Sequence, residues 1–178
     1  MAFGDTRYDK GLDILLEALK RVDEEFILYI AGKDTYFSKE YIISQSKQYK
    51  EKIRLDLQFI SDERKEKYFA GTDIVILPYR RIFDGASGPL GEGVIKEKVI
   101  VGPGHGSIGR LIEENHLGYI FDSEDPDSLA KVLTKAIQSE FVYDKTALEY
   151  KDTLSPERMR REYENLFQDL LKVSQFSG

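Results

Sequence analysis

The chain has 178 residues, of which 41% are hydrophobic, and a formal net charge of -6. Such a length and composition are typical of one soluble domain, and the acidic balance argues against a basic face for nucleic acid or anionic lipid. The chain contains no Cys, which excludes disulfide scaffolds and Cys-ligated metal sites. No apolar run approaches the ~20 residues that a membrane helix needs, and the opening residues lack a signal-peptide pattern, so a cytoplasmic location is expected.

In the first half, helical and strand-like spacing of apolar residues alternate. Leu12, Leu15, Leu16, Leu19 and Val22 recur at helical intervals, which indicates one apolar helix face. The predicted elements are a helix at 10–23, a strand at 26–30, a helix at 38–51, a strand at 55–59, and a helix at 62–69 that Asp62 can cap.

Residues 73–79, DIVILPY, form a continuous apolar run with β-branched residues, as expected for a parallel strand that is covered on both faces. Pro78 marks its end. The elements predicted after it are a helix from Leu90, a strand at 99–101, a helix from Ser107, a strand at 118–121, a helix from Pro126, and a helix from Pro156 to about Val173. Asp125 and Ser155 each place a capping side chain before the proline of the last two helices.

Strands that alternate with helices predict an α/β fold: a doubly wound, mostly parallel Rossmann-like sheet with helices on both faces. Only residues 1–3 precede the first loop and helix, where this fold needs a strand. We therefore expect residues 1–178 to be a single domain cut from a longer protein.

The loop at residues 4–11, GDTRYDKG, places Arg7 and Lys10 directly before the first helix. In an open α/β sheet, ligands bind where the carboxyl ends of strands meet helix amino termini. Cations are unfavourable at the positive end of a helix dipole, so their position points to an anionic partner such as a diphosphate. Two solvated loop side chains are an equally weighted interpretation.

The loop within RRIFDGASGPLGEG, residues 80–93, is the most informative segment. Its small residues leave backbone amides uncovered before a helix, which suits phosphate oxygens: Gly85, Ser87, Gly88 and Gly91. Asp84 and Glu92 bracket the loop, and carboxylates can accept paired hydrogen bonds from the hydroxyls of a ribose or hexose. An ordinary glycine-containing turn is the alternative, because the acidic spacing alone is a weak signal.

Together these segments resemble the family-four retaining glycosyltransferases of the GT-B fold. FGDTRYDKGLDILLEAL resembles the family's opening strand end and phosphate loop, ILYIAGKD its second strand, and DIVILPYR the strand before its donor loop. Asp84 to Glu92 resembles its signature of Glu, seven residues and Glu. The resemblance covers most of the chain and implies the C-terminal, nucleotide-sugar-binding half of such an enzyme, without its N-terminal acceptor domain.

The resemblance also implies roles for individual residues. Arg7 and Lys10 would contact the donor diphosphate, and Asp84, where the family usually has Glu, would contact the donor sugar; these are the implied catalytic residues. The implied donor-binding residues are Gly32 beside the nucleotide, Ser87, Gly88, Pro89 and Leu90 in the donor loop, and Glu92 on the ribose.

The implied reaction moves a sugar from a nucleoside-diphosphate sugar to an unidentified acceptor with retention of configuration, as in a hexosyltransferase. It implies no cofactor and no metal, and it requires stabilisation of the departing diphosphate. The isolated domain is expected to be inactive, because acceptor contacts and cleft closure need the other domain. We expect no membrane contact from this domain, and peripheral membrane association of the full-length protein stays open.

Two other hypotheses remain. Gly104, Gly106 and Gly109 form G-x-G-x-x-G after a predicted strand, and Asp122 ends the next one, so an NAD-binding oxidoreductase domain is the alternative. That fingerprint normally opens a fold with several strands to follow, and it leaves Lys10 unexplained. A non-catalytic nucleotide-binding scaffold is the third hypothesis.

The remaining polar candidates are weaker. His105 and His116 are the only histidines and lie too far apart for a single-helix metal motif, so we expect His116 to be an exposed turn residue. Arg80 and Arg81 either reach a phosphate or an acceptor, or are solvated charges after a strand.

Overall fold

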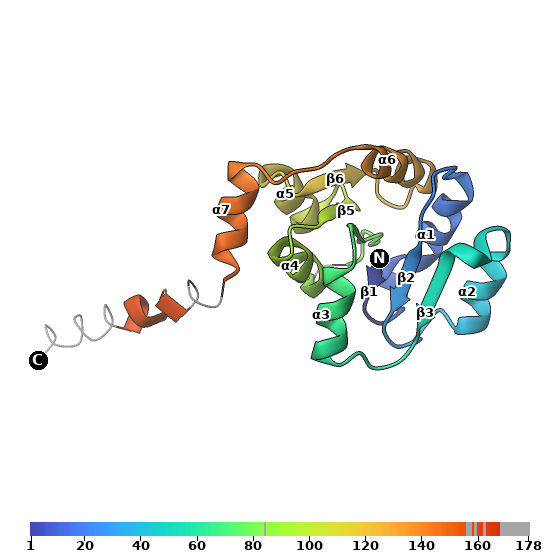
Figure 1. Cartoon of the computed structure of the whole chain (residues 1–178), viewed down its shortest axis with the longest axis horizontal. Coiled ribbons are helices and arrows are strands. Elements are labelled where there is room, and N and C mark those ends of the chain that lie inside the picture. Colours follow the sequence, from blue (N-terminus) through green and yellow to red (C-terminus); the bar gives the residue numbers. More distant parts are fainter. Residues whose placement is uncertain (84, 156–157, 159, 162, 168–178) are drawn as a thin grey trace, which may run out of the picture.

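In the computed structural model, the residues described are 1–83, 85–155, 158, 160–161 and 163–167. Strands and helices alternate along the chain, as predicted (Figure 1). The strands are β1 Ala2–Phe3, β2 Leu28–Ala31, β3 Ile53–Asp56, β4 Ile74–Ile76, β5 Val99–Pro103 and β6 Gly118–Phe121. The α-helices are α1 Leu12–Ala18, α2 Lys39–Gln45, α3 Asp62–Ala70, α4 Gly88–Ile95, α5 Gly106–Glu114, α6 Pro126–Gln138 and α7 Lys145–Thr153. Short 3-10 helices occur at Tyr8–Lys10, Leu19–Arg21 and Lys47–Lys52.

The strands form two parallel three-stranded sheets, in the orders β1-β2-β3 and β4-β5-β6. Backbone hydrogen bonds of Met1 join the two sheets at β1 and β4. The Met1 nitrogen donates to the Ile74 carbonyl at 2.6 Å, and the Ile76 amide donates to the Met1 carbonyl at 2.9 Å. The chain thus runs outward from β1 and later returns to β4 beside it, which makes this junction the switch point where doubly wound sheets bind ligands.

Helices cover both faces of these sheets, because neighbouring residues of the central strands point to opposite sides. Val75 packs in the cluster beneath α4 and α5, whereas the next residue, Ile76, packs in the cluster beneath α1 and α6. In β5, Ile100 likewise packs in the cluster beneath α4 and α5, and Val101 packs in the cluster beneath α1 and α6. This two-sided burial explains the continuous apolar run of β4, and the α/β fold class predicted from the sequence is confirmed.

In the first half, two details of the prediction were wrong. The strand predicted at 55–59 lies at Ile53–Asp56, because its ladder pairs Leu28 with Ile53 and ends at Asp56; Phe59 is 73% exposed. The cap of α3 is Ser61, whose hydroxyl accepts from the Arg64 amide at 3.4 Å, so Asp62 is the first helical residue instead.

In the second half, Asp125 caps α6 as predicted, since its carboxylate accepts from the amides of Asp127 and Ser128. Helix α7 was not predicted, although Asp144 caps it by accepting from the Ala147 amide at 3.0 Å. A further helix was predicted from Pro156 to about Val173. Both of these end residues lie outside the described residues. Within the described part of the chain, no helix combines the length and apolar character needed to cross a membrane.

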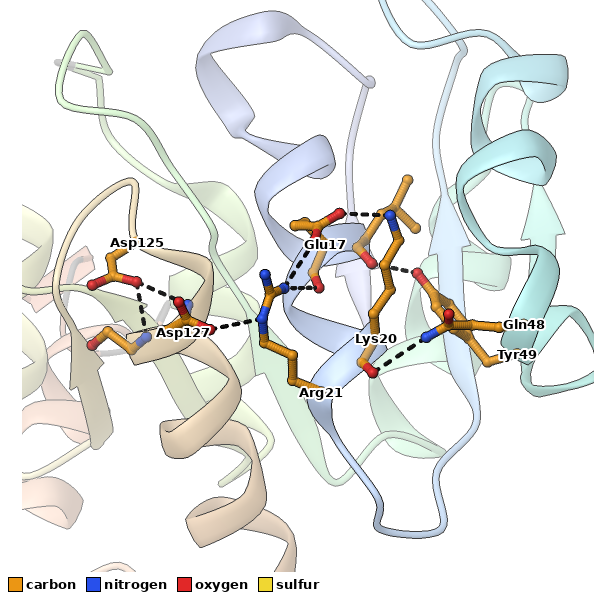
Figure 2. A network of polar contacts seen from close by, with 9 residues as sticks. Glu17, Lys20, Arg21, Gln48, Tyr49, Asp125 and Asp127 are labelled. Atoms are coloured by element: carbon orange, nitrogen blue, oxygen red, sulfur yellow. Dashed lines mark hydrogen bonds and ion pairs between the residues drawn. The ribbon is translucent and has the colours of Figure 1, made fainter.

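Polar contacts fix α1 between its neighbours on one face (Figure 2). The Arg21 guanidinium pairs with Asp127 of α6 at 2.7 Å and with Glu17 at 3.0 Å. On the other side, the buried Tyr49 hydroxyl donates to the Leu16 carbonyl at 2.5 Å. The helix that begins next to Lys10 is therefore held against both α6 and the 3-10 segment before β3.

We expect Tyr49→Phe to lower the free energy of unfolding at pH 7 by about 0.5–1.5 kcal/mol, the usual value of one hydrogen bond. Burial raises the pKa of Tyr49 above its ordinary value. The unfolded chain therefore releases this proton near pH 10 while the folded chain retains it, so the wild type loses stability as pH rises above about 10.

The deficit of the phenylalanine variant should shrink above pH 10, which urea unfolding at pH 7 and pH 10.5 would measure. Gln48→Ala, which removes an exposed 3.2 Å bond to the Lys20 carbonyl, is the control without pH dependence. A deficit of constant size at both pH values would contradict this account.

A candidate anion-binding site at the switch point

A small pocket opens beside the carboxyl ends of β1 and β4, lined by Gly4, Thr6, Lys10, Pro78 and Tyr79 among others. Lys10 reaches it from the 3-10 turn before α1, and its Nζ lies 5.9 Å from the centre of the Tyr79 ring. Burial lowers the pKa of Lys10, and the nearby Arg7 charge lowers it further. The Asp5 and Asp9 carboxylates offset only part of this effect, so the pocket holds a lysine whose charged form is disfavoured.

Arg7 lies on the same loop, with its side chain 54% exposed. Its Nε donates to the Asp9 carboxylate at 2.9 Å, and a second bond joins Nη2 to the other oxygen of Asp9. This pairing leaves other guanidinium N–H groups for a ligand, because Arg has five. Arg7 lies close enough for its charge to act on Lys10, and Asp9 is a partner of Arg7 that the sequence analysis did not identify.

Tyr79 connects the first loop to the second. This residue is 2% exposed, its hydroxyl lies 3.2 Å from Ser87 Oγ, and its ring lies beneath Lys10. Burial raises the pKa of Tyr79 to about 12, so the hydroxyl keeps its proton at neutral pH. The sequence analysis missed this residue, and its position directly after Pro78, just beyond the end of β4, was the available signal.

Ser87 caps α4 by accepting from the Leu90 amide at 3.3 Å. Pro89 has no N–H, and the Leu90 amide already donates to the cap. Within the described part of the loop, the amides of Ser87 and Gly88 are therefore the ones best suited to bind an anion. A Cβ on Gly88 would have no neighbour within 4 Å, which indicates an open approach. The positive end of the α4 dipole therefore faces open space.

Gly32 packs against the backbone of Gly4, which lines the pocket. It has a φ of +137°, and a Cβ there would lie 2.3 Å from the Gly4 carbonyl, so only glycine permits this approach of the two loops. Thr6 fixes the same contact, since its buried hydroxyl donates to the Phe37 carbonyl at 2.9 Å and accepts from the Thr35 amide at 3.0 Å.

Glu92 lies on α4, and Lys10 precedes α1, so both follow strands that meet at the switch point. The Glu92 carboxylate pairs with Lys65 of α3 at 2.7 Å. Asp84, the other acid of the predicted pair, lies outside the described residues.

The sequence analysis offered two interpretations of Arg80, a solvated charge or a contact to a phosphate or acceptor. In the structure Arg80 instead pairs with other residues of the protein. Its side chain is 11% exposed and pairs with Asp13 of α1 and, at 3.4 Å, with Glu124. Its guanidinium also covers the Tyr8 ring at 4.1 Å. Arg80 therefore holds the Lys10 loop in place, whereas Arg81 is exposed.

The glycine turn at 104–109 follows β5, one strand away from the switch point. It is thus separate from the Lys10 loop, which weakens the NAD hypothesis. His105 contacts the Ser123 hydroxyl, and His116, in a left-handed turn with φ 53°, pairs with Asp144 at 2.7 Å. Among the described residues, no group of three or more His, Asp or Glu side chains is placed to hold a metal ion.

A family model described as glycosyl transferases group 1 matches residues 2–153. A search of curated proteins finds no match. A glycosyltransferase from Rickettsia africae has the same fold, with a TM-score of 0.74 and 19% identity over 96% of this chain and 48% of that one. Anabaena HepE in complex with UDP and glucose has a TM-score of 0.69 and 17% identity over 94% of this chain and 48% of that one.

A third structure is the C-terminal domain of a glycosyl transferase group 1 family protein, LpcC, from Francisella tularensis, with a TM-score of 0.64 and 20% identity over 85% of this chain and 80% of that one. At these identities the likeness establishes the fold alone. The chain spans about half the length of the Rickettsia and Anabaena proteins.

Lys10 and Arg80 should respond oppositely to replacement. Lys10→Met should raise the free energy of unfolding by about 0.5–1 kcal/mol, because it removes a desolvated charge that no ligand compensates. Arg80→Met should lower it by about 2–3 kcal/mol, because it leaves Asp13 partly buried without its partner. Urea unfolding at pH 7 without ligand measures both, and a destabilised Lys10→Met variant would show that Lys10 serves the fold instead.

Proposed function

The chain belongs to the glycosyl transferases group 1 family, and from that membership we propose that it is the donor-binding domain of a retaining, family-four glycosyltransferase of the GT-B fold. Its ligand is a nucleoside-diphosphate sugar. The observation that carries this proposal is the convergence of Lys10, Arg7 and the open amino end of α4 at one switch point. UDP bound to Anabaena HepE, a protein of the same fold, supports this ligand class.

The diphosphate adds negative charge beside Lys10 to that of Asp5 and Asp9. Burial and the Arg7 charge lower the pKa of Lys10, and a bound dianion opposes both effects, so binding raises the pKa of Lys10. The amides of Ser87 and Gly88 and the α4 dipole add to the attraction. In a transferase the same groups stabilise the departing diphosphate as the bond to the sugar breaks.

The two acids are assigned from the family resemblance. We assign Glu92 to the ribose hydroxyls and Asp84 to the donor sugar, with Gly32 beside the nucleotide. Asp is one methylene shorter than Glu, so Asp84 demands a closer approach of the sugar. No cofactor or metal is part of this proposal.

Transfer to an acceptor requires a second domain on the N-terminal side, which supplies acceptor contacts and excludes water when the cleft closes. This chain alone is therefore expected to bind the donor without transferring its sugar. The choice of acceptor belongs to that second domain.

We expect the chain to bind at least one of UDP, GDP and ADP in calorimetric titration, with an affinity that falls as salt rises. Lys10→Met should weaken this binding about 10–100-fold, the equivalent of one charged hydrogen bond, and Lys145→Met on the exposed start of α7 should not. Tight binding of NAD without binding of any nucleoside diphosphate would favour the oxidoreductase hypothesis. Binding of none of these nucleotides would favour a non-catalytic scaffold.

Glu92→Gln should weaken nucleoside diphosphate binding by about 1–3 kcal/mol while leaving inorganic pyrophosphate binding unchanged, because only the nucleotide carries a ribose. Glu63→Gln, on the exposed side of α3, is the matched control. An equal loss of affinity for the nucleoside diphosphate and for pyrophosphate would indicate that Glu92 acts on the phosphates or on the fold.

A further inference from the structure

Two ion pairs of opposite polarity join α3 to α4. Lys65 of α3 donates to Glu92 of α4 at 2.7 Å, and Lys96 of α4 donates to Glu66 of α3 at 2.5 Å. Lys65 and Glu92 lie nearer the amino ends of their helices, which face the carboxyl edge of the sheet, and Lys96 lies one turn further from that edge. The two bridges thus connect the same helices, but only one lies beside the candidate site.

The bridge beside the site is also the more enclosed one. The side chains of Lys65 and Glu92 are 26% and 27% exposed, whereas that of Glu66 is 53% exposed. Asp62, in the first turn of α3, also lies 3.4 Å from Lys65 Nζ, but its side chain is 98% exposed, so this second pair contributes little. Glu92 is therefore the main partner of Lys65.

The bridge uses one oxygen of Glu92, Oε1, and leaves Oε2 as an acceptor. An unrestrained glutamate loses rotamer freedom when a ligand binds, and this lost freedom weakens binding by about 2–10-fold for a side chain of this kind. A glutamate that is already held by an ion pair avoids most of that cost.

We propose that Lys65 is a positioning residue for ribose recognition: it orients the Glu92 carboxylate so that Oε2 accepts from the ribose hydroxyls. This inference rests on the proposed function. Lys65 acts through Glu92 and does not touch the nucleotide. The Lys96–Glu66 bridge, by contrast, only docks the two helices.

The test is a double-mutant cycle that uses calorimetric titration with UDP and with inorganic pyrophosphate. Lys65→Met should weaken UDP binding about 2–10-fold, leave pyrophosphate binding unchanged, and have no further effect in a chain that already carries Glu92→Gln. Lys65→Arg, which keeps the charge, should restore part of the loss. Lys96→Met should leave UDP binding unchanged, although it breaks a bridge between the same helices.

The outcomes separate this inference from the function on which it rests. If the wild type binds GDP or ADP but not UDP, that nucleotide replaces UDP in the cycle. If the wild type binds none of the three, the proposed donor site fails and the role of Lys65 fails with it. If Glu92→Gln weakens UDP binding and Lys65→Met does not, the donor site stands and the positioning role is overturned. A Lys65 effect that persists in the Glu92→Gln variant, or one that Lys96→Met reproduces, overturns it as well, in favour of a direct contact or of helix docking.

Discussion

The hydrogen bonds between Met1 and β4 decide where the chemistry of this protein can occur. Through them β1 lies beside β4, and the loops at residues 4–11 and 80–93, which are far apart in the sequence, leave the same edge of the protein. Everything assigned to the site depends on that junction, including the approach of Tyr79 to both Lys10 and Ser87. Without it the sheets would present two unrelated loops.

At this edge of the sheet, two positively charged side chains, Arg80 and Lys10, have different roles. Arg80 is satisfied by Asp13 and Glu124, so it stabilises the position of the first loop. Lys10 lies close by, yet burial and Arg7 disfavour its charge. A protein with a net charge of -6 thus keeps a buried lysine whose charged form an anionic ligand would stabilise, although Asp5 and Asp9 also lie near it.

Local sequence signals located most of the helices and strands. They failed where contact with another part of the chain determines the structure. Pairing with β2 sets the end of β3, so the alternation through Phe59 misled the prediction. Helix α7 has a capping Asp144 but no proline after it, and the cap alone was overlooked. The role of Arg80 was not readable, because its partners lie on α1 and on the loop after β6.

The sequence by itself determined the alternation of strands and helices, the family resemblance and the two glycine-containing loops, because periodicity and backbone requirements are local properties of the chain. Only the tertiary structure decided which side chains meet. It paired Lys65 with Glu92, placed Tyr79 between the loops and assigned Arg80 to the fold, because these contacts join residues from different elements whose proximity depends on strand order and helix packing.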